Sequence, residues 1–186
     1  MKWKELLEIR SGKNQKTVID PNGQYPIYGS GGIIGYATEY LCPPKTTIVG
    51  RKGTINSPIF VNESFWNVDT AFGLIPSSKL LPKYLYYFCC HFNFTALDKS
   101  TTIPSLAKRD LENIEMNVPP LDEQSRIVTR IEELFSELDK AVGTLKTTKE
   151  QLEVYRQAVL KAAFEGKYTK WWRKNHNAVS YTHLTL

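Results

Sequence analysis

The segment LDEQSRIVTRIEELFSELDKAVGTLKTTKEQLEVYRQAVLKAAFEG, residues 121–166, sets the architecture of this chain. Apolar side chains recur along it at alternating steps of four and three residues, the 3.5-residue period that is typical of a coiled-coil seam. The seam comprises Ile127, Ile131, Leu134, Leu138, Ala141, Leu145, Thr148, Leu152, Tyr155, Val159 and Ala162. A helix of about 43 residues would be ~65 Å long. Because the rest of the chain cannot enclose such a helix, we expect it to pair with another helix.

Both ends of the predicted helix carry suitable signals. Asp122 is predicted to be the N-cap, with Glu123 in the first turn, where the helix dipole favours carboxylates. Gly166 is predicted to end the helix, because glycine readily adopts the left-handed conformation found after a last turn.

A second apolar row, Val128, Phe135 and Val142, lies beside the seam in the first half of the helix only. The same flank of the second half carries Lys149 and Arg156. We therefore predict that the first half packs on two surfaces, its own globular domain and another helix. The second half is predicted to pack on a helix alone.

The sequence before the Pro119-Pro120 pair is rich in turn residues and short β-prone runs and lacks the coiled-coil period. Glycine, proline and asparagine residues separate short β-prone runs, and Thr46–Val49 and Ile59–Val61 are typical of strands. One further helix is predicted from Pro82 toward Phe92, and another over Leu106–Asn113 with Ser105 as its N-cap.

The predicted fold class is α+β: a mixed α/β globular domain with several short strands, followed by a long coiled-coil helix. We place the globular domain at residues 1–120 and the helix at residues 121–166. The tail, residues 167–186, is expected to be disordered, since its last residues, 178–186, follow no helix pattern.

Charge and composition limit the possible functions. The net charge of +5 is uneven: residues 1–122 carry +2, residues 123–165 carry −1 and residues 166–186 carry +4. A DNA-binding surface would therefore have to be a local patch. Cys42, Cys89 and Cys90 lack metal-ligand spacing. With neither a signal peptide nor ~20 consecutive apolar residues, a cytoplasmic protein without a membrane segment is expected.

No catalytic constellation is evident in the sequence. In the glycine-rich run of residues 29–35, the third glycine of a dinucleotide-binding G-x-G-x-x-G would fall at Ile34. His91, His176 and His183 lie in separate segments, where packed or solvated side chains are the simpler interpretation. We therefore expect no enzyme activity, no cofactor and no metal site.

Several segments, in order along the chain, resemble the target recognition domain of type I restriction-modification specificity subunits. They include a GRKG motif at Gly50–Gly53 and a W-x-x-D-x-A motif at Trp66–Ala71. The full set is Trp3–Ile9, Tyr25–Tyr36, Thr47–Gly53, Phe65–Ala71, Thr101–Leu106, Val118–Gln124 and Ala162–Lys167. Each motif is weak alone, but their order over residues 3–172 is specific.

The resemblance implies a protein that reads DNA on behalf of other subunits. In that family, two recognition domains each bind one half of a bipartite double-stranded target, and two antiparallel long helices set the gap between them. Methylation and restriction subunits assemble on this scaffold, which itself catalyses nothing. With one domain and one helix, this chain is expected to be a half-length form that dimerises through antiparallel helices and recognises a palindromic bipartite target. A truncated gene is the alternative.

DNA contacts are expected from loops that offer cations to phosphates, and amides or hydroxyls to base edges. Lys99–Thr102 is the favoured segment, because small hydroxyls follow a cation there. Arg51 could instead be a structural hydrogen-bond donor within the Gly50–Gly53 turn. The candidates are Lys13, Asn14, Ser30, Arg51, Lys52, Lys99, Ser100, Thr101, Thr102, Lys108 and Arg109.

Two other functions fit the sequence. The chain could be a coiled-coil protein-interaction module whose globular part binds protein, and salt-sensitive DNA affinity would separate this function from the first. It could also be the recognition fragment of a fused restriction–methylation enzyme.

Overall fold

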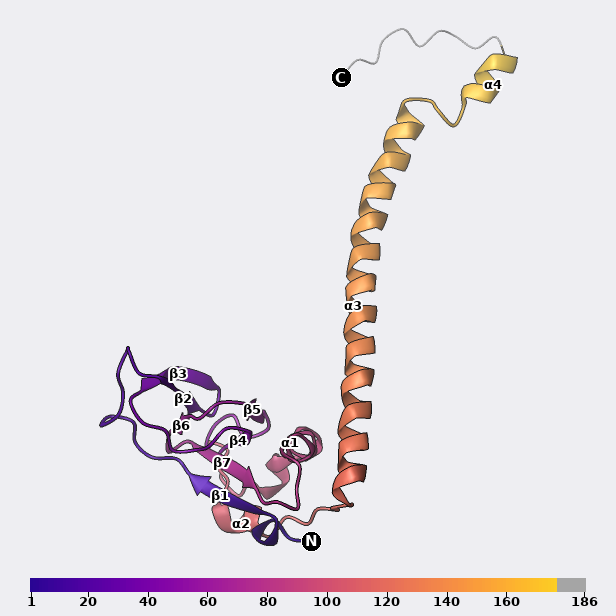
Figure 1. The fold of residues 1–186 in the computed structure, drawn as a ribbon. Helices are drawn as coiled ribbons and strands as arrows, with labels where there is room; N and C mark the ends of the chain where they lie inside the picture. The colour runs from indigo at the N-terminus through magenta and orange to yellow at the C-terminus, as the bar shows by residue number, and fades with distance from the viewer. Residues whose placement is uncertain (177–186) are drawn as a thin grey trace. The chain divides into compact units, whose positions relative to one another are not determined.

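Two β-sheets form the framework of the globular part in the computed structural model, which describes residues 1–176 (Figure 1). The larger sheet is antiparallel, with the strand order β1-β7-β4-β5, and the smaller sheet has the order β3-β2-β6. The strands are β1 (Leu7–Ser11), β2 (Tyr25–Gly29), β3 (Gly32–Ala37), β4 (Thr46–Gly50), β5 (Ile59–Val61), β6 (Trp66–Asn67) and β7 (Ala71–Pro76). The two strands predicted at 46–49 and 59–61 are confirmed as β4 and β5.

Strand β4 lies inside the larger sheet, and all of its residues are buried. Since successive side chains of a strand point to opposite faces, Val49 joins the main core and Ile48 joins a smaller cluster on the other face. Thr46 is accommodated in this apolar setting because its hydroxyl donates to the carbonyl of Pro43 at 2.7 Å.

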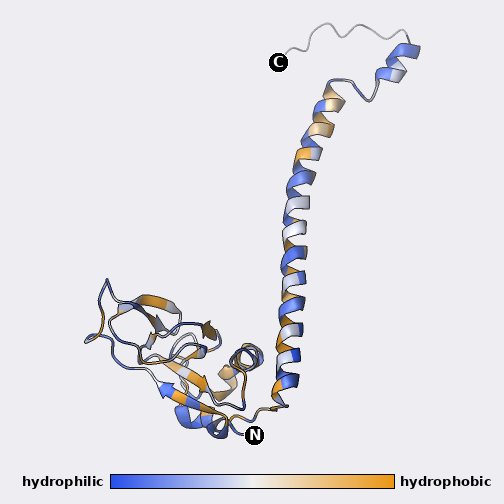
Figure 2. Cartoon of the chain, in the orientation of Figure 1, coloured by the Kyte–Doolittle hydropathy of each residue, from blue (hydrophilic) through white to orange (hydrophobic). Residues whose placement is uncertain are grey.

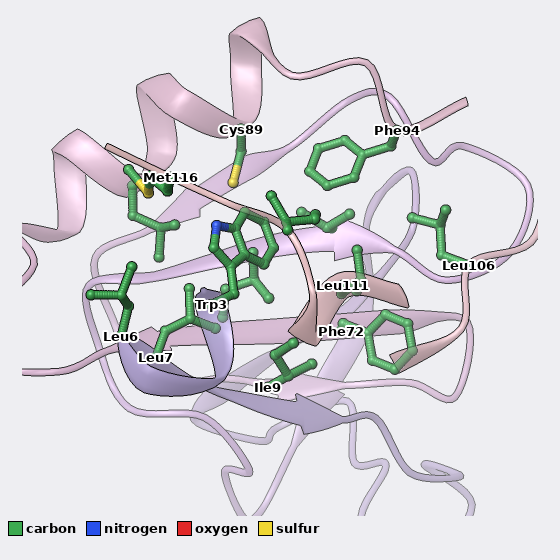
Figure 3. Close-up of a cluster of buried hydrophobic side chains, with 14 of the residues drawn as sticks. Trp3, Leu6, Leu7, Ile9, Phe72, Cys89, Phe94, Leu106, Leu111 and Met116 are labelled. Atoms are coloured by element: carbon green, nitrogen blue, oxygen red, sulfur yellow. The ribbon is translucent and has the colours of Figure 1, made fainter. Parts of the chain in front are cut away.

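The main core is built around Trp3, which belongs to the short 3-10 helix η1 (Trp3–Glu5) and is fully buried. Its ring meets Phe88 and Phe94 edge to face, with centroids 6.0 and 6.2 Å apart. Figure 3 shows Trp3 surrounded by side chains from both ends of the domain, including Leu6 and Leu111. The backbone N–H of Trp3 donates to the carbonyl of Ile114, so the start of the chain is held by its later part.

The helices of the domain agree with the predictions except at one N-terminus. Helix α1 (Pro82–His91) begins at Pro82 as predicted, and the 3-10 helix η2 (Phe94–Leu97) follows it. Helix α2 spans Lys108–Glu112, with Ala107 rather than Ser105 at its N-cap. The prediction for Ser105 is wrong: this residue forms an isolated β-bridge with Lys52, and its backbone N–H donates to Oδ1 of Asp98, so the helix begins later.

The long helix is confirmed as α3 (Leu121–Phe164), which has 44 residues. It begins at Leu121, so Asp122 lies in the first turn and is not the N-cap that the sequence predicted. The carbonyl of Pro120 instead accepts from the backbone N–H groups of the first turn. Gly166 ends the helical stretch as predicted: its φ is +71°, and the N–H of Lys167 donates to the carbonyl of Ala162.

The compact unit of the globular part extends to Glu132, beyond the boundary expected at residue 120. Gln124, fully buried, explains this extension. Its Oε1 accepts from the N–H of Leu81 at 2.8 Å, and its Nε2 donates to the carbonyls of Lys79 and Pro119 at 3.0 and 2.8 Å. Val128 is buried beside it, so the first turns of α3 are part of the domain core.

The second unit, residues 133–186, contains most of α3 and exposes its seam. Leu138, Leu145 and Tyr155 are 58%, 69% and 66% exposed, and apolar residues recur along the helix in Figure 2. Phe135 and Val142 are 53% and 42% exposed, so within this chain Val128 is the buried member of the second apolar row. Most of the seam predicted from the sequence is therefore exposed among the described residues.

A short helix, α4 (Lys170–Asn175), follows the long one. The expectation of a disordered tail therefore does not hold for these six residues, and residues 177–186 lie outside the described part. Among residues 1–176, none of the helices combines the length and the apolar character that crossing a membrane requires.

Candidate nucleic-acid interface

The ends of three strands of the larger sheet coincide. Ser11, the last residue of β1, is paired with Phe72, and Gly50, the last residue of β4, is paired with Ala71 at the start of β7. The segments that follow β1 and β4 and the segment that precedes β7 therefore leave the sheet at the same end. We refer to this end, with the loops that surround it, as the loop end of the domain.

The smaller sheet contributes a fourth segment to the loop end. β2 and β3 form a hairpin whose turn contains Ser30, and β2 runs parallel to β6 with Tyr28 opposite Asn67. The Cβ atom of Ser30 is 3.1 Å from the position that a Cβ on Gly50 would occupy. The hairpin turn therefore packs directly on the end of β4.

The GRKG turn after β4 depends on its two glycines. A Cβ on Gly50 would lie 2.0 Å from the carbonyl oxygen of Thr54, and Gly53 has a φ of +78°, a conformation that side chains disfavour. Within the turn, the N–H of Arg51 donates to the carbonyl of Thr70 at 2.7 Å, which ties the turn to the segment before β7. The glycines thus let two loops approach each other closely.

A fifth segment, the loop of residues 98–106, is held to the same turn. The N–H of Gly53 donates to the carbonyl of Pro104 at 2.9 Å, and the N–H of Leu106 donates to the carbonyl of Arg51 at 2.8 Å. At the start of the loop, Oδ1 of Asp98 accepts from the backbone N–H of Ser100 and, across the loop, from that of Ser105. These contacts order the backbone of the loop, and Thr101 and Thr102 are exposed on it.

Asn67 joins the two sheets behind the loop end. It is fully buried, and its Nδ2 donates to the carbonyl of Ala71 at 3.2 Å and to that of Arg10 at 3.4 Å. The backbone carbonyl of Asn67 accepts from the backbone N–H of Lys13 at 3.0 Å. Neither Asn67 nor Asp98 is recognisable as a site residue from the sequence. The W-x-x-D-x-A motif contained the first, but its bonding to distant residues was not visible from the sequence.

Six of the proposed DNA contacts therefore come together at the loop end: Lys13, Ser30, Arg51, Lys52, Thr101 and Thr102. Arg51 is half-buried, its Nη1 lies 3.4 Å from the carbonyl of Asp69, and its guanidinium lies 5.8 Å from the ring centre of Phe72. This geometry fits the structural role considered for Arg51. Lys13 and Lys52 are exposed and available for a ligand.

Most of the other candidates have local partners. Lys99 forms an ion pair with Asp110 at 3.0 Å, and Lys108 lies 3.9 Å from Glu112 in the next turn of α2. Both pairs are substantially exposed, so they hold their cations weakly. Arg109 is exposed on α2, and Asn14 accepts from the N–H of Lys16 in a local turn. Ser100 has its hydroxyl 2.6 Å from both Asp98 and the carbonyl of Ile103.

The raised pKa values of Cys42 and Cys89 indicate that these two cysteines have a structural and not a chemical role. Burial raises the pKa of the Cys42 thiol to about 12, and burial also raises the pKa of Cys89 well above its usual value. Thiols of this kind stay protonated and are poor nucleophiles. The hydroxyl and backbone N–H of Ser100 lower the pKa of Asp98, which keeps this carboxylate ionised and accepting hydrogen bonds. Within residues 1–176, His, Cys, Asp and Glu form no cluster suited to a metal ion.

The globular domain has two sheets and carries cations and hydroxyls on ordered loops. A long amphipathic helix with an exposed seam follows it. Together they define the class of a recognition scaffold, a domain that binds a ligand through its loops and is joined to a long helix. The chain belongs to the family described as the type I restriction modification DNA specificity domain, whose model matches residues 1–154.

Known proteins resemble this chain over most of its length. It is 23% identical to the type I restriction enzyme EcoDI specificity subunit of Escherichia coli, over 93% of this chain and 39% of that protein. It is 28% identical to the EcoBI specificity subunit of the same species, over 89% of this chain and 33% of that protein. The chain therefore spans well under half the length of these relatives.

Solved structures share the fold. The S subunit of a type I restriction-modification system from M. genitalium aligns with a TM-score of 0.63 at 18% identity, covering 93% of this chain and 48% of that one. The HsdS subunit from Thermoanaerobacter tengcongensis aligns with a TM-score of 0.69 at 19% identity, covering 89% and 44%. The α+β domain followed by a long helix is thus the fold of known specificity subunits.

Proposed function

We propose that this chain is a sequence-specific DNA recognition subunit of a type I restriction-modification system, and that it binds one half of a bipartite double-stranded target. The observation that carries the proposal is the convergence of five loop segments at one end of two sheets, in a chain that belongs to a DNA specificity family. Such an end offers several side chains to one DNA site at once.

The loop end offers two kinds of DNA contact, one to phosphates and one to base edges. Lys13 and Lys52 are exposed cations suited to phosphate oxygens, which position a protein on DNA without reading its sequence. Ser30, Thr101 and Thr102 carry hydroxyls that can donate to or accept from base edges. Lys99, Lys108 and Arg109 on the neighbouring surface extend the cationic area.

The exposed seam of α3 suits a second copy of the chain. Two long helices paired antiparallel would hold two loop ends at a fixed separation, and the two-fold symmetry predicts a palindromic bipartite target. The methylation and restriction subunits of the same cytoplasmic system would act at the DNA held in this way. The chain itself contributes recognition and no catalysis.

The decisive experiment is co-expression of the chain with the methylation subunit of its own system, followed by mapping of methylated adenines in the host genome. A palindromic bipartite motif supports both DNA recognition and a symmetric dimer. A non-palindromic motif supports recognition but requires a different second half. No methylation, together with no salt-sensitive DNA binding by the purified chain, contradicts the proposal and favours a protein-interaction module.

A further inference from the structure

The hairpin of β2 and β3 contains a β-bulge beside the loop end. Tyr28 of β2 is opposite Ile33 of β3. The residue before it, Ile27, is opposite Gly35, so the register shifts by one residue. Ile34 is therefore the extra residue of this bulge. Bulges interrupt the regular alternation of a strand and redirect side chains, often next to a functional site.

The bulged Ile34 is exposed although it is large and apolar. It is 55% exposed, and its Cγ2 lies 3.7 Å from the position that a Cβ on Gly29 would occupy. Cγ2 of Val68 lies 3.8 Å from the same position. Ile34 thus lies over the bare backbone of Gly29, beside Val68, and presents the rest of its side chain to solvent. Ile33 is 53% exposed, but it is opposite Tyr28 and so lies on the other face of the hairpin.

Backbone contacts place Val68 between the two exposed cations of the loop end. The carbonyl of Asn67, the residue before Val68, accepts from the N–H of Lys13 at 3.0 Å. The carbonyl of Thr70, two residues after Val68, accepts from the N–H of Lys52 at 3.2 Å. The exposed isoleucine beside Val68 is therefore close to two groups suited to phosphate oxygens.

We propose that Ile34 contacts the C5 methyl group of a thymine in the major groove, so that the domain distinguishes this base from the other three. The inference rests on the proposed function, since it names one base contact of the same DNA site. An isoleucine side chain neither donates nor accepts a hydrogen bond, and the thymine methyl is the apolar group that the major groove offers. That groove also admits a two-stranded β-ribbon, which the β2–β3 hairpin is.

This contact adds discrimination that the hydroxyls of the loop end do not supply. Ser30, Thr101 and Thr102 can each donate or accept, so each can bind several kinds of base edge. The C5 methyl belongs to thymine alone among the four unmodified bases. Burial of this one methyl group against Ile34 corresponds to a gain in affinity of about three- to fivefold.

Uracil substitution in the DNA tests the proposal, because it removes the C5 methyl and leaves base pairing unchanged. The full chain, in complex with the methylation subunit of its own system, is titrated with duplexes of the mapped target. In each duplex one thymine is replaced by uracil. The mapped target contains thymine, since the methylated base is adenine. We expect at least one position at which the uracil duplex binds about three- to fivefold less tightly.

Variants assign the effect to one side chain. Ile34→Ala should bind the thymine duplex about three- to fivefold less tightly than wild type, and it should bind the two duplexes equally well. Because the ratio of the two affinities is measured within one variant, it does not depend on how much of that variant is folded. Ile33→Ala is the matched control, with the same residue type and nearly equal exposure on the other face, and it should retain the wild-type ratio. Ile34→Val should retain most of it.

Three results would overturn the proposal: no effect of uracil at any position in wild type, an unchanged ratio in Ile34→Ala, or loss of the ratio in Ile33→Ala. Weaker association of Ile34→Ala with the methylation subunit, at an unchanged ratio, would make this residue a protein contact instead.

These results are distinguishable from failure of the proposed function. Salt-sensitive binding of the target without any effect of uracil removes the thymine contact and leaves DNA recognition intact. Absence of both methylation and DNA binding overturns the two proposals together.

Discussion

Oδ1 of Asp98 accepts a hydrogen bond from the backbone N–H of Ser105 at 3.0 Å, and this contact closes the loop that presents Thr101 and Thr102. The same oxygen accepts from the N–H of Ser100 at 2.9 Å, so a single carboxylate orders both ends of the loop.

Asp98→Ala is expected to lower DNA affinity about tenfold. Without the carboxylate the loop is not ordered before it binds, and ordering it on binding costs free energy of association. Asp98→Asn retains an oxygen acceptor and should lose less. Both affinities can be measured by fluorescence anisotropy with the mapped target. Equal affinities for wild type and Asp98→Ala would show that the order of this loop does not matter for binding.

The lowered pKa of Asp98 predicts a pH dependence of the loop. A group whose pKa is lower in the folded state stabilises it above the unfolded pKa, and that contribution is lost as the pH falls through the folded pKa. The loop should therefore be fully ordered at neutral pH and loosen only in acid, below about pH 4. Amide exchange of Ser105, compared with that of Leu74 in the core, measures this directly. Loosening of the loop near pH 6 would contradict the assignment to Asp98.

Lys99→Ala is expected to weaken binding to all DNA sequences and to reduce the slope of log K against log salt by ~0.9, as for one lost phosphate contact. The weak, exposed pair with Asp110 leaves Lys99 free to exchange partners. Lys4→Ala, an exposed lysine on η1, is the control and should leave the slope unchanged. An unaltered slope for Lys99→Ala would remove this residue from the interface.

Gln124→Leu is expected to destabilise the domain by about 2–4 kcal/mol, because three backbone groups would lose their partner in a buried place. Ser125→Ala, exposed on the same turn of α3, should change the stability by less than about 0.5 kcal/mol. Urea unfolding followed by circular dichroism compares the two variants. Similar midpoints would show that the first turns of α3 are not fixed to the domain through Gln124.

The two glycines Gly50 and Gly143 should respond oppositely to alanine. Gly50→Ala forces a Cβ to within 2.0 Å of a backbone oxygen and should destabilise the domain by about 2–4 kcal/mol. Around Gly143 there is open space, so Gly143→Ala should stabilise the helix by about 1 kcal/mol. Thermal unfolding of both variants tests this, and stabilisation by Gly50→Ala would contradict the close approach of the GRKG turn.

The sequence by itself determined the long helix, its seam and its end at Gly166, because helix periodicity and capping depend on residues close together in the chain. For the same reason, it located β4, β5 and the start of α1. It misplaced the N-caps at Ser105 and Asp122, where competing hydrogen bonds and the preceding proline decide the geometry. The boundary at residue 120 also differs from the end of the compact unit, since the burial of Gln124 involves groups distant in sequence.

Only the tertiary structure decided which candidate residues lie together. Ser30, Lys52 and Thr101 are far apart in the chain, and strand register brings their loops to one end of two sheets. The structure also revealed the roles of Asn67, which donates to the carbonyl of the distant Arg10, and of Asp98, whose carboxylate closes the loop of residues 98–106. Sequence patterns carry local preferences, whereas register and loop packing arise from contacts between distant segments, which form only when the whole domain folds.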